Sequence, residues 1–253
     1  MSIKEIRTKI DRAREHLGVL AAEVDAWAAG DPVIYIAARW HRYQWLRGPP
    51  LRWAAIFGDC VHNLRSALDH MIWDLSGGTG NAPPRSEFPI FDDQTKYLER
   101  GKNGKPVHGS GLAKIEGVKD LDARRVIRNL QPFKASEPHR HPLWVLHELD
   151  RVDKHRALHP VLGWPYGEPW RLDIHDDETL RPGFRQIRAL EGRDYPETGL
   201  RTRTKRRADL VIELILPGGT VEWTDNVDVL LSKLVDYVER EAFRGLEPWL
   251  EYP

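Results

Sequence analysis

The sequence predicts an α+β fold: a mainly α-helical bundle of four to five helices, with a small antiparallel β-sheet inserted before the C-terminal helix. Three observations support this prediction. Within residues 1–157, apolar residues recur at three- and four-residue steps, which is the period of an amphipathic helix. Within 158–224, apolar and polar residues alternate between Pro and Gly turns, as in antiparallel strands. A helical period returns in 225–253, so we expect a helical bundle, a β insertion and a returning helix.

The first predicted helix covers residues 2–29 and is ended by Gly30-Asp31-Pro32. Its apolar residues are Ile3, Ile6, Ile10, Ala13, Leu17, Leu20, Val24 and Trp27. This spacing gives about four heptads, which is typical of a bundle or coiled-coil seam. We therefore expect this helix to pack along the second one, because two long apolar faces can bury each other.

The second predicted helix runs from about residue 51 to residue 75, after the break at Gly48-Pro49-Pro50. Its apolar face consists of Phe57, Cys60, Val61, Leu64, Leu68, Met71, Ile72 and Leu75. Its polar positions lack Lys and Glu, which normally fill solvated helix faces, and carry mostly short or titratable side chains. We therefore expect protein, a partner or a substrate to cover this face instead of water.

Shorter helices are predicted further along the chain. One covers 118–130 and is halted by Gln131-Pro132, and another runs from Pro142 to about residue 157, because Pro suits the first helical position. The residues between the second helix and 118 are rich in loop-forming residues. Among them, 101–111 (GKNGKPVHGSG) is typical of a mobile loop.

The β insertion is predicted from four segments that alternate or carry β-branched residues: 170–176, 183–190, 208–216 and 220–223. Pro217-Gly218-Gly219 indicates a hairpin turn between the last two. Asp225 or Asn226 then caps the final helix, whose apolar face includes Leu230, Leu231 and Leu234.

The composition excludes several classes of protein. The 38 basic and 38 acidic residues balance, so the total charge indicates no particular partner. The single cysteine, Cys60, excludes an intramolecular disulfide and fits a reducing compartment. The N-terminal sequence is charged from its start, unlike a signal peptide, and no apolar run is long enough to span a bilayer. We expect a cytoplasmic protein with no membrane association and no cofactor.

On the second helix, His62, Arg65 and Asp69 fall within about 60° of one another, beside the apolar face. Arg65 and Asp69 are spaced i, i+4 and can form an ion pair. A second polar row around the back of the helix consists of Asp59, Asn63, Ser66 and His70. Two interpretations stay open: an Arg–Asp pair with capping polar residues at a packing boundary, or a set of catalytic side chains.

A second polar group occurs in residues 146–156, LHELDRVDKHR. On a helix, Asp150 and Asp153 share an arc with the apolar residues Leu146 and Leu149. Burying ionised carboxylates without partners costs about several kcal/mol each, so they must be paired, protonated or bound to a metal.

His147 and Lys154 flank these two aspartates. We expect Asp150 or Asp153 to accept a hydrogen bond from Arg65, His62 or Lys154 across two facing helices. The plain alternative is a buried network of salt bridges that fixes the register of the helices and has no further role.

The sequence Arg65-Ser-Ala-Leu-Asp-His70 matches the Arg-x4-His signature of HEPN-type domains, and the chain resembles that family here. HEPN domains are α-helical bundles, and many are metal-independent endoribonucleases whose composite site forms in a homodimer. The resemblance implies that Arg65 binds the scissile phosphate of an RNA as a bidentate donor. It implies that His70 takes part in proton transfer for attack by the 2′-hydroxyl. From their positions on the helix, we predict that Asp69 and His62 belong to the same catalytic site.

Two features of this match bear on how such a site would form. Arg65 and His70 lie about 140° apart on a straight helix, so a dimer or a bend is needed to bring them together. HEPN members often carry Asn, Asp or another polar group after the Arg, where this chain has Ser66. The chain also resembles a class of uncharacterised bacterial proteins that share GD-x-VHNLRSALDH, a following FPIF and L-x-x-VDKHR.

A basic strip lies between two predicted strands and consists of Arg201, Arg203, Lys205, Arg206 and Arg207. Such strips attract nucleic-acid phosphates, although this one lacks the aromatic residues that stack on bases. The plain alternative is a solvated hairpin without a function.

Three functions remain in view. The first is a HEPN-like endoribonuclease of toxin or defence type, which works as a homodimer and has an antitoxin or another protein as its partner. The second is a non-catalytic binding or scaffold protein with a buried Arg/His/Asp network. The third is a metal-binding bundle enzyme, since Asp59-x-x-His62 and His147-x-x-Asp150 have ligand spacing. The Glu-x-x-His pairs of carboxylate-bridged metal sites are absent, so we predict no metal.

Overall fold

The computed structural model describes residues 3–30, 33–36, 42–45, 50, 52–78, 82–83, 86–155, 160–163, 173–175, 186–188, 209–216 and 219–250. Side chains are described in 3–27, 29–30, 50, 52–78, 82–83, 86–151 and 227–250. The chain divides into two compact units. We call the first, which comprises Met1–Val19, Ala54–Leu158 and Asp228–Pro253, the helical unit. The second unit comprises Leu20–Trp53 and His159–Val227.

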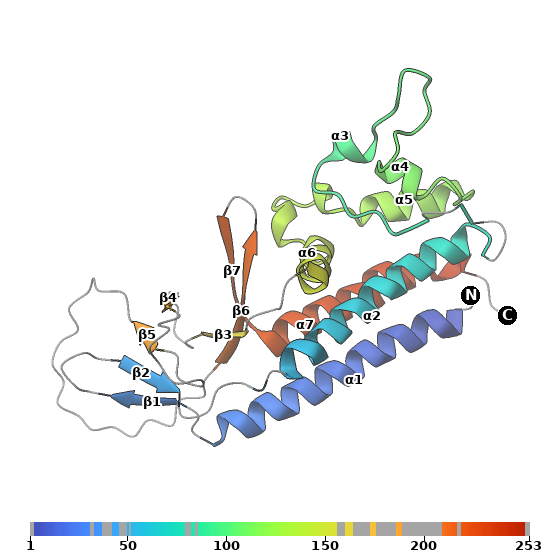
Figure 1. The fold of residues 1–253 in the computed structure, drawn as a ribbon. Helices are drawn as coiled ribbons and strands as arrows, with labels where there is room; N and C mark the ends of the chain where they lie inside the picture. The colour runs from blue at the N-terminus through green and yellow to red at the C-terminus, as the bar shows by residue number, and fades with distance from the viewer. Residues whose placement is uncertain are drawn as a thin grey trace. The chain divides into compact units, whose positions relative to one another are not determined.

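The described regular elements of the helical unit are helices (Figure 1). The long ones are α1 (Ile3–Ala28), α2 (Arg52–Leu75), α6 (Pro142–His155) and α7 (Val227–Tyr237). The short ones are α3 (Gln94–Tyr97), α4 (Gly111–Lys114), α5 (Leu121–Asn129) and α8 (Arg244–Leu246). Single turns are the 3₁₀ helices η1 (Pro132–Lys134), η2 (Pro138–Arg140) and η4 (Glu247–Trp249), and the π-helix η3 (Val238–Phe243). Within the described ranges, no helix combines the length and the apolarity needed to cross a membrane.

α1 packs along α2, as its apolar spacing predicts (Figure 1). Its buried residues include Ile3, Ile6, Ile10, Ala13, Leu20 and Trp27. In the helical unit, the Cys60 thiol of α2 donates a hydrogen bond to the Ala13 carbonyl oxygen at 3.3 Å. In the second unit, the Trp27 ring meets the Trp53 ring edge-on, with 5.5 Å between centroids. Each large apolar side chain buried in such a seam contributes about 1.5–3 kcal/mol.

The C-terminal helices of the helical unit contact the same α1. Arg7 pairs with Glu247 at 2.6 Å, and its guanidinium lies 5.3 Å from the centroid of the Phe243 ring. Arg14 pairs with Glu239. These pairs are largely exposed and contribute little to stability. The predicted apolar face of the C-terminal helix is buried at Val227, Leu230, Leu231, Leu234 and Val238, and Val235, which was not predicted, is buried with them.

Between α2 and α3, residues 86–91 form a segment without regular structure, which we call the linking segment. Its Phe88 side chain is fully buried, so this segment belongs to the core. The three short helices that follow begin at side-chain caps. Asp93, Ser110 and Asp120 each accept a hydrogen bond from a backbone N–H group in the first turn of the helix that follows.

The strands belong to the second unit, where the structure describes their backbone. They are β1 (Val33–Ile36), β2 (Arg42–Trp45), β3 (Pro160–Gly163), β4 (Asp173–His175), β5 (Gln186–Arg188), β6 (Asp209–Leu216) and β7 (Gly219–Asn226). One sheet has the order β1-β2-β5-β4 and the other has the order β3-β6-β7, with antiparallel pairing throughout.

The predicted fold class, an α+β bundle with one small antiparallel sheet inserted before the last helix, is wrong. Within its described residues, the helical unit holds neither a strand nor a sheet, so its architecture is helical. The predicted single inserted sheet is not seen either, because β1 and β2 precede α2 and pair into the four-stranded sheet. β1 and β2 lie in residues 33–47, where an apolar run of only four residues does not reveal its period.

Candidate functional site

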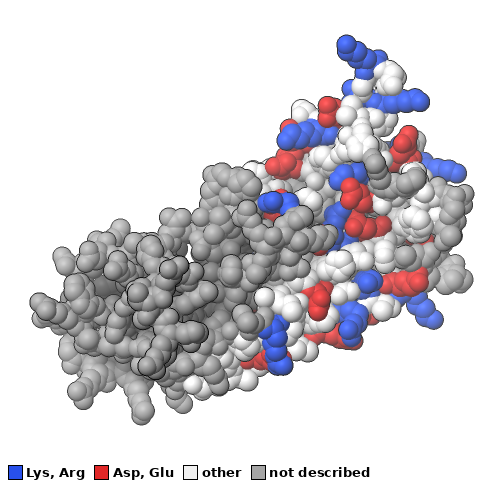
Figure 2. All heavy atoms as spheres, viewed as in Figure 1, with Lys and Arg blue, Asp and Glu red and all other residues white. Residues whose placement is uncertain are grey.

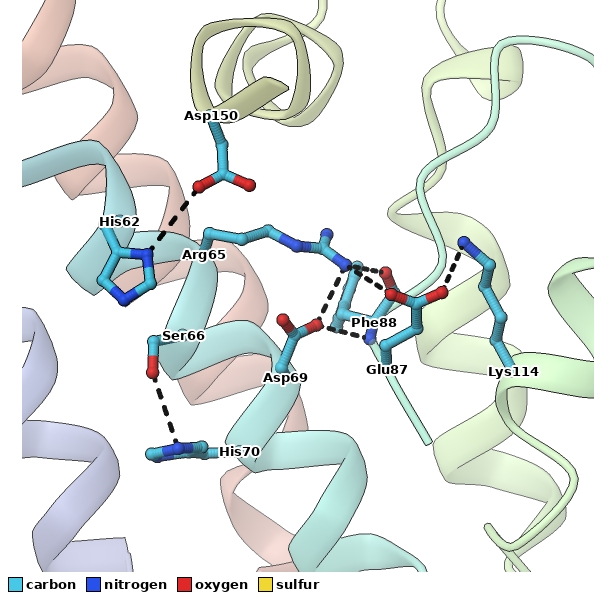
Figure 3. A network of polar contacts seen from close by, with 9 residues as sticks. All are labelled: His62, Arg65, Ser66, Asp69, His70, Glu87, Phe88, Lys114 and Asp150. Carbon is cyan, nitrogen blue, oxygen red and sulfur yellow. Dashed lines mark hydrogen bonds and ion pairs between the residues drawn. The ribbon is translucent and has the colours of Figure 1, made fainter. Parts of the chain in front are cut away.

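Arg65 lies at the centre of a polar cluster between α2 and the linking segment (Figure 3). Its side chain is only 7% exposed. The Nη2 atom donates to the Phe88 carbonyl oxygen at 2.8 Å and lies 2.9 Å from Asp69 Oδ1 and 3.7 Å from Glu87 Oε2. The predicted i, i+4 pair of Arg65 and Asp69 is therefore confirmed.

Asp69 completes a contact with a single residue of the linking segment. Its Oδ1 atom accepts a hydrogen bond from the Phe88 backbone N–H at 2.9 Å, while Arg65 donates to the carbonyl oxygen of the same residue. We call Arg65 and Asp69 the backbone clamp. Burial raises the pKa of Asp69 above its ordinary value, against the opposing effects of the Arg65 charge and the Phe88 N–H.

Glu87 and Lys114 form the outer side of the cluster. Their Oε1 and Nζ atoms lie 2.8 Å apart, and Glu87 is about half exposed while Lys114 is mostly buried. Burial acts to raise the pKa of Glu87, but the hydrogen bond and charge of Lys114, together with the Arg65 charge, lower it overall. Glu87 is therefore a carboxylate at neutral pH and keeps Arg65 surrounded by negative charge.

α6 faces the same cluster through Asp150 and His147. The His62 Nδ1 atom lies 3.9 Å from Asp150 Oδ1, which is an ion-pair distance longer than a hydrogen bond. The carboxylate partners of Arg65 are Asp69 and Glu87. The sequence had indicated Asp150 or Asp153 of α6 as a partner for Arg65. Burial, reinforced by the charges of Arg65 and Lys114, lowers the pKa of His147, so this imidazole is neutral at pH 7.

His70 lies on a different flank of α2 from Arg65 (Figure 3). Its Nε2 atom is 3.5 Å from the Ser66 hydroxyl, and its buried Nδ1 atom has no hydrogen-bond partner among the described residues. Burial, with a further contribution from Lys9 of α1, lowers the pKa of His70. A single chain therefore does not bring Arg65 and His70 together.

Several predicted site residues lie beyond what the structure describes. The side chains of Asp153 and Lys154 fall outside the described side chains, although both residues are part of α6. The basic strip Arg201, Arg203, Lys205, Arg206 and Arg207 falls outside the described residues altogether. Among the described side chains, no three His, Cys, Asp or Glu residues are grouped as metal ligands would be.

Two residues near the polar cluster, Phe88 and Gln131, were not among the residues predicted from the sequence. Phe88 supplies both backbone groups held by the clamp, and the only available indication was the FPIF pattern after the second helix. Gln131 is fully buried; its Oε1 atom accepts from the Phe91 N–H at 3.1 Å, and its Nε2 atom donates to the Ile127 carbonyl at 3.0 Å. A Gln at the end of a helix before Pro132 carries no sequence pattern that distinguishes it from a surface residue.

Comparison of the chain with protein-family models, with curated proteins and with solved structures found no match. The site therefore has to be interpreted from its own geometry. On the face shown in Figure 2, acidic and basic side chains are interspersed over the described helices, and the body of this face carries no broad field of one sign.

Proposed function

We propose that this protein is a non-catalytic binding protein in which the Arg-x4-His motif serves the fold. The observation that carries this proposal is the state of Arg65. Its guanidinium is buried, paired with Asp69 and hydrogen-bonded to the Phe88 carbonyl. An arginine that binds a scissile phosphate must reach the substrate, and releasing Arg65 would strip two partners from a buried charge.

The placement of His70 supports the same proposal. A phosphate-binding arginine and a proton-transferring histidine must meet at one reacting group, whereas Arg65 and His70 lie on different flanks of α2 (Figure 3). Arg65 and Asp69 instead hold the linking segment to α2 by its backbone, which is a structural task. The partner class of such a binding protein is set by its exposed surface.

A HEPN-like metal-independent endoribonuclease is the second candidate, and His70 is the observation that favours it. Its lowered pKa keeps the imidazole neutral at pH 7, and its Nδ1 atom has no described partner, so the ring can accept a proton. This candidate needs a homodimer in which Arg65 leaves its clamp. On this alternative the protein is a toxin or defence enzyme, and an antitoxin or another protein partner inhibits it.

One experiment separates the two candidates. The purified protein, His70→Ala and Arg65→Ala are incubated with total RNA in EDTA, and the products are analysed on a denaturing gel. We expect intact RNA with all three proteins, together with a large loss of thermal stability for Arg65→Ala only. RNA fragments with cyclic or 2′/3′ phosphate ends, formed by the parent protein and lost in His70→Ala at an unchanged melting temperature, would overturn the proposal.

A further inference from the structure

The connection between α3 and α4 projects away from the helices that it joins (Figure 1). We call residues 98–110 the finger. Although its Gly, Lys and Asn content is typical of a mobile loop, its backbone is closed by hydrogen bonds. The Val107 N–H donates to the Glu99 carbonyl at 3.1 Å, and the Gly101 N–H donates to the Lys105 carbonyl at 2.9 Å. The finger is therefore a short stapled hairpin with a defined tip.

Further contacts fix the turn at the tip. The Gly104 N–H donates to the Gly101 carbonyl at 2.9 Å, and Asn103 Oδ1 accepts from the Lys105 N–H at 3.0 Å. Gly104 has a φ of +74°, a conformation that an L side chain rarely adopts. The Arg100 guanidinium donates to the Gly104 carbonyl at 2.8 Å and so braces the turn from one side.

The tip of the finger, residues 100–105, carries three basic and no acidic side chains, and the exposed Glu99 lies at its base. Arg100, Lys102 and Lys105 are exposed, residues 100–110 contain no Asp or Glu, and Figure 2 shows basic side chains on this projection. Within the described part of the chain, none of the three cations forms an ion pair. Many other cations of the helical unit are paired with carboxylates: Arg7, Arg14, Lys114, Arg125, Arg140 and Arg151. The tip cations are thus available to an external anion.

The other side chains of the tip indicate which anion. Protein partners are usually gripped by aromatic and large apolar anchors, and the exposed tip carries none. Gly101, Gly104 and Asn103 are small and allow a bulky anionic chain to approach the backbone. Nucleic-acid phosphates are bound by just this combination of Lys, Arg, small polar groups and accessible backbone.

We propose that the finger binds the phosphate backbone of a nucleic acid through Arg100, Lys102 and Lys105. Because these groups contact phosphates alone, the binding is independent of base sequence and weakens with added salt. This inference rests on the proposed non-catalytic function in one respect: we expect the bound RNA strand to stay intact.

The test measures fluorescence anisotropy of a short labelled RNA of mixed sequence over a series of salt concentrations, with the full-length protein. In Lys102→Gln/Lys105→Gln we expect binding about tenfold weaker at low salt. The slope of log affinity against log salt should shrink by about 0.7 for each lost single-strand phosphate contact. The matched control is Lys4→Gln/Lys119→Gln, which removes the same charge from two exposed lysines elsewhere on the helical unit and should bind like the parent.

A second variant tests the shape of the finger separately from its charge. Gly104→Ala changes no charge and meets no neighbouring atom, but it disfavours the positive φ of the turn. We expect it to bind more weakly than the parent at an unchanged melting temperature. The proposal is overturned if the double lysine variant binds the labelled RNA as tightly as its control variant does. It is also overturned if polyglutamate displaces the labelled RNA from the parent protein as effectively as unlabelled RNA does.

The fate of the labelled RNA keeps the two proposals apart. Intact RNA that is bound through the lysines supports both the finger and the proposed non-catalytic function. Cleaved RNA overturns the non-catalytic function and leaves the finger in place. Failure to bind overturns the finger and leaves the structural role of Arg65 unaffected.

Discussion

Arg65 shows how one buried cation can organise a core. Its charge would be costly in isolation, but Asp69, Glu87 and the Phe88 carbonyl compensate it at Nη2, while the buried Nη1 atom has no hydrogen-bond partner among the described residues. Asp69 in turn accepts the Phe88 N–H, so neither backbone group of that residue is left unpaired at the clamp. The i, i+4 spacing on α2 makes this arrangement possible, because it places both side chains on one face of the helix.

The first prediction concerns this clamp. Arg65→Ala leaves the partly exposed Asp69 carboxylate without its cation and the Phe88 carbonyl without its donor, so the free energy of unfolding should fall by about 1–3 kcal/mol. Arg65→Lys should recover only part of this loss, because an ammonium is more strongly hydrated than a guanidinium and therefore costs more to bury. Chemical denaturation measures both values. His70→Ala on the other flank is the control and should cost far less; equal losses at Arg65 and His70 would contradict the clamp.

The second prediction concerns His141, which precedes α6. Its Nδ1 atom accepts the Leu143 N–H at 3.2 Å, and its Nε2 atom lies 3.0 Å from the Tyr237 hydroxyl. Burial lowers the pKa of His141 from 6.5 to about 4. Because the folded pKa is depressed, the stability that His141 supplies is complete above pH 6.5. It is lost as the pH falls towards 4, since protonation removes the Nδ1 acceptor.

Denaturation of the parent protein and of His141→Asn at a series of pH values checks this prediction. Asn can cap a helix but does not titrate, so the variant should lose less stability than the parent between pH 6.5 and pH 4. Parallel curves for the two proteins would contradict the role of His141.

Among the elements, the linking segment depends most on side chains from elsewhere in the chain. Besides the clamp at Phe88, the Phe91 N–H is held by Gln131, and the Phe91 carbonyl accepts the Phe133 N–H at 3.1 Å. A segment without regular structure can enter a core only when such partners satisfy its backbone. This explains why the segment packs between helices and not over them.

The third prediction follows from Gln131. Gln131→Ala removes the acceptor of the part-buried Phe91 N–H and leaves this donor without a partner, so stability should fall by about 1–3 kcal/mol. Amide hydrogen exchange at Phe91 should accelerate more than exchange in α2. Gln94→Ala, at an exposed position, is the matched control and should change neither quantity. Unchanged exchange at Phe91 would show that the segment is held in another way.

The long helices could be predicted from the sequence, whereas the partners of the linking segment could not. Long helices carry their period in many residues, so α1, α2 and α6 and the pairing of Arg65 with Asp69 could be predicted. The partners of the linking segment could not, because Gln131 and Phe88 are distant in sequence and follow no period. The part of the four-stranded sheet formed by β1 and β2 could not be predicted either, since short strands such as Val33–Ile36 hold too few residues to show alternation or to indicate their partners.

At the scale of the whole molecule, the seam between α1 and α2 joins the longest helices of the chain. Cys60 lies inside this seam in the helical unit, with no exposed surface and its thiol bonded to the Ala13 carbonyl. Because the Cys60 sulfur is fully buried against α1, we expect a reagent to reach it only when the two helices separate. Cys60 therefore reports on the opening of the helical unit as a whole.

The fourth prediction is that Cys60 reacts with a thiol reagent only through this opening. Burial raises the pKa of its thiol to about 12, so the reactive thiolate is scarce even where the reagent penetrates. The labelling rate in native buffer should be slower than that of an exposed thiol by about the equilibrium constant for unfolding, and it should rise with denaturant with the slope of global unfolding. Asp59→Cys in a Cys60→Ala background supplies the exposed reference at the neighbouring position. Rapid labelling of Cys60 in native buffer, at a rate near that reference, would mean that α1 leaves α2 without unfolding of the helical unit, and the seam would then be a hinge and not the core of the fold.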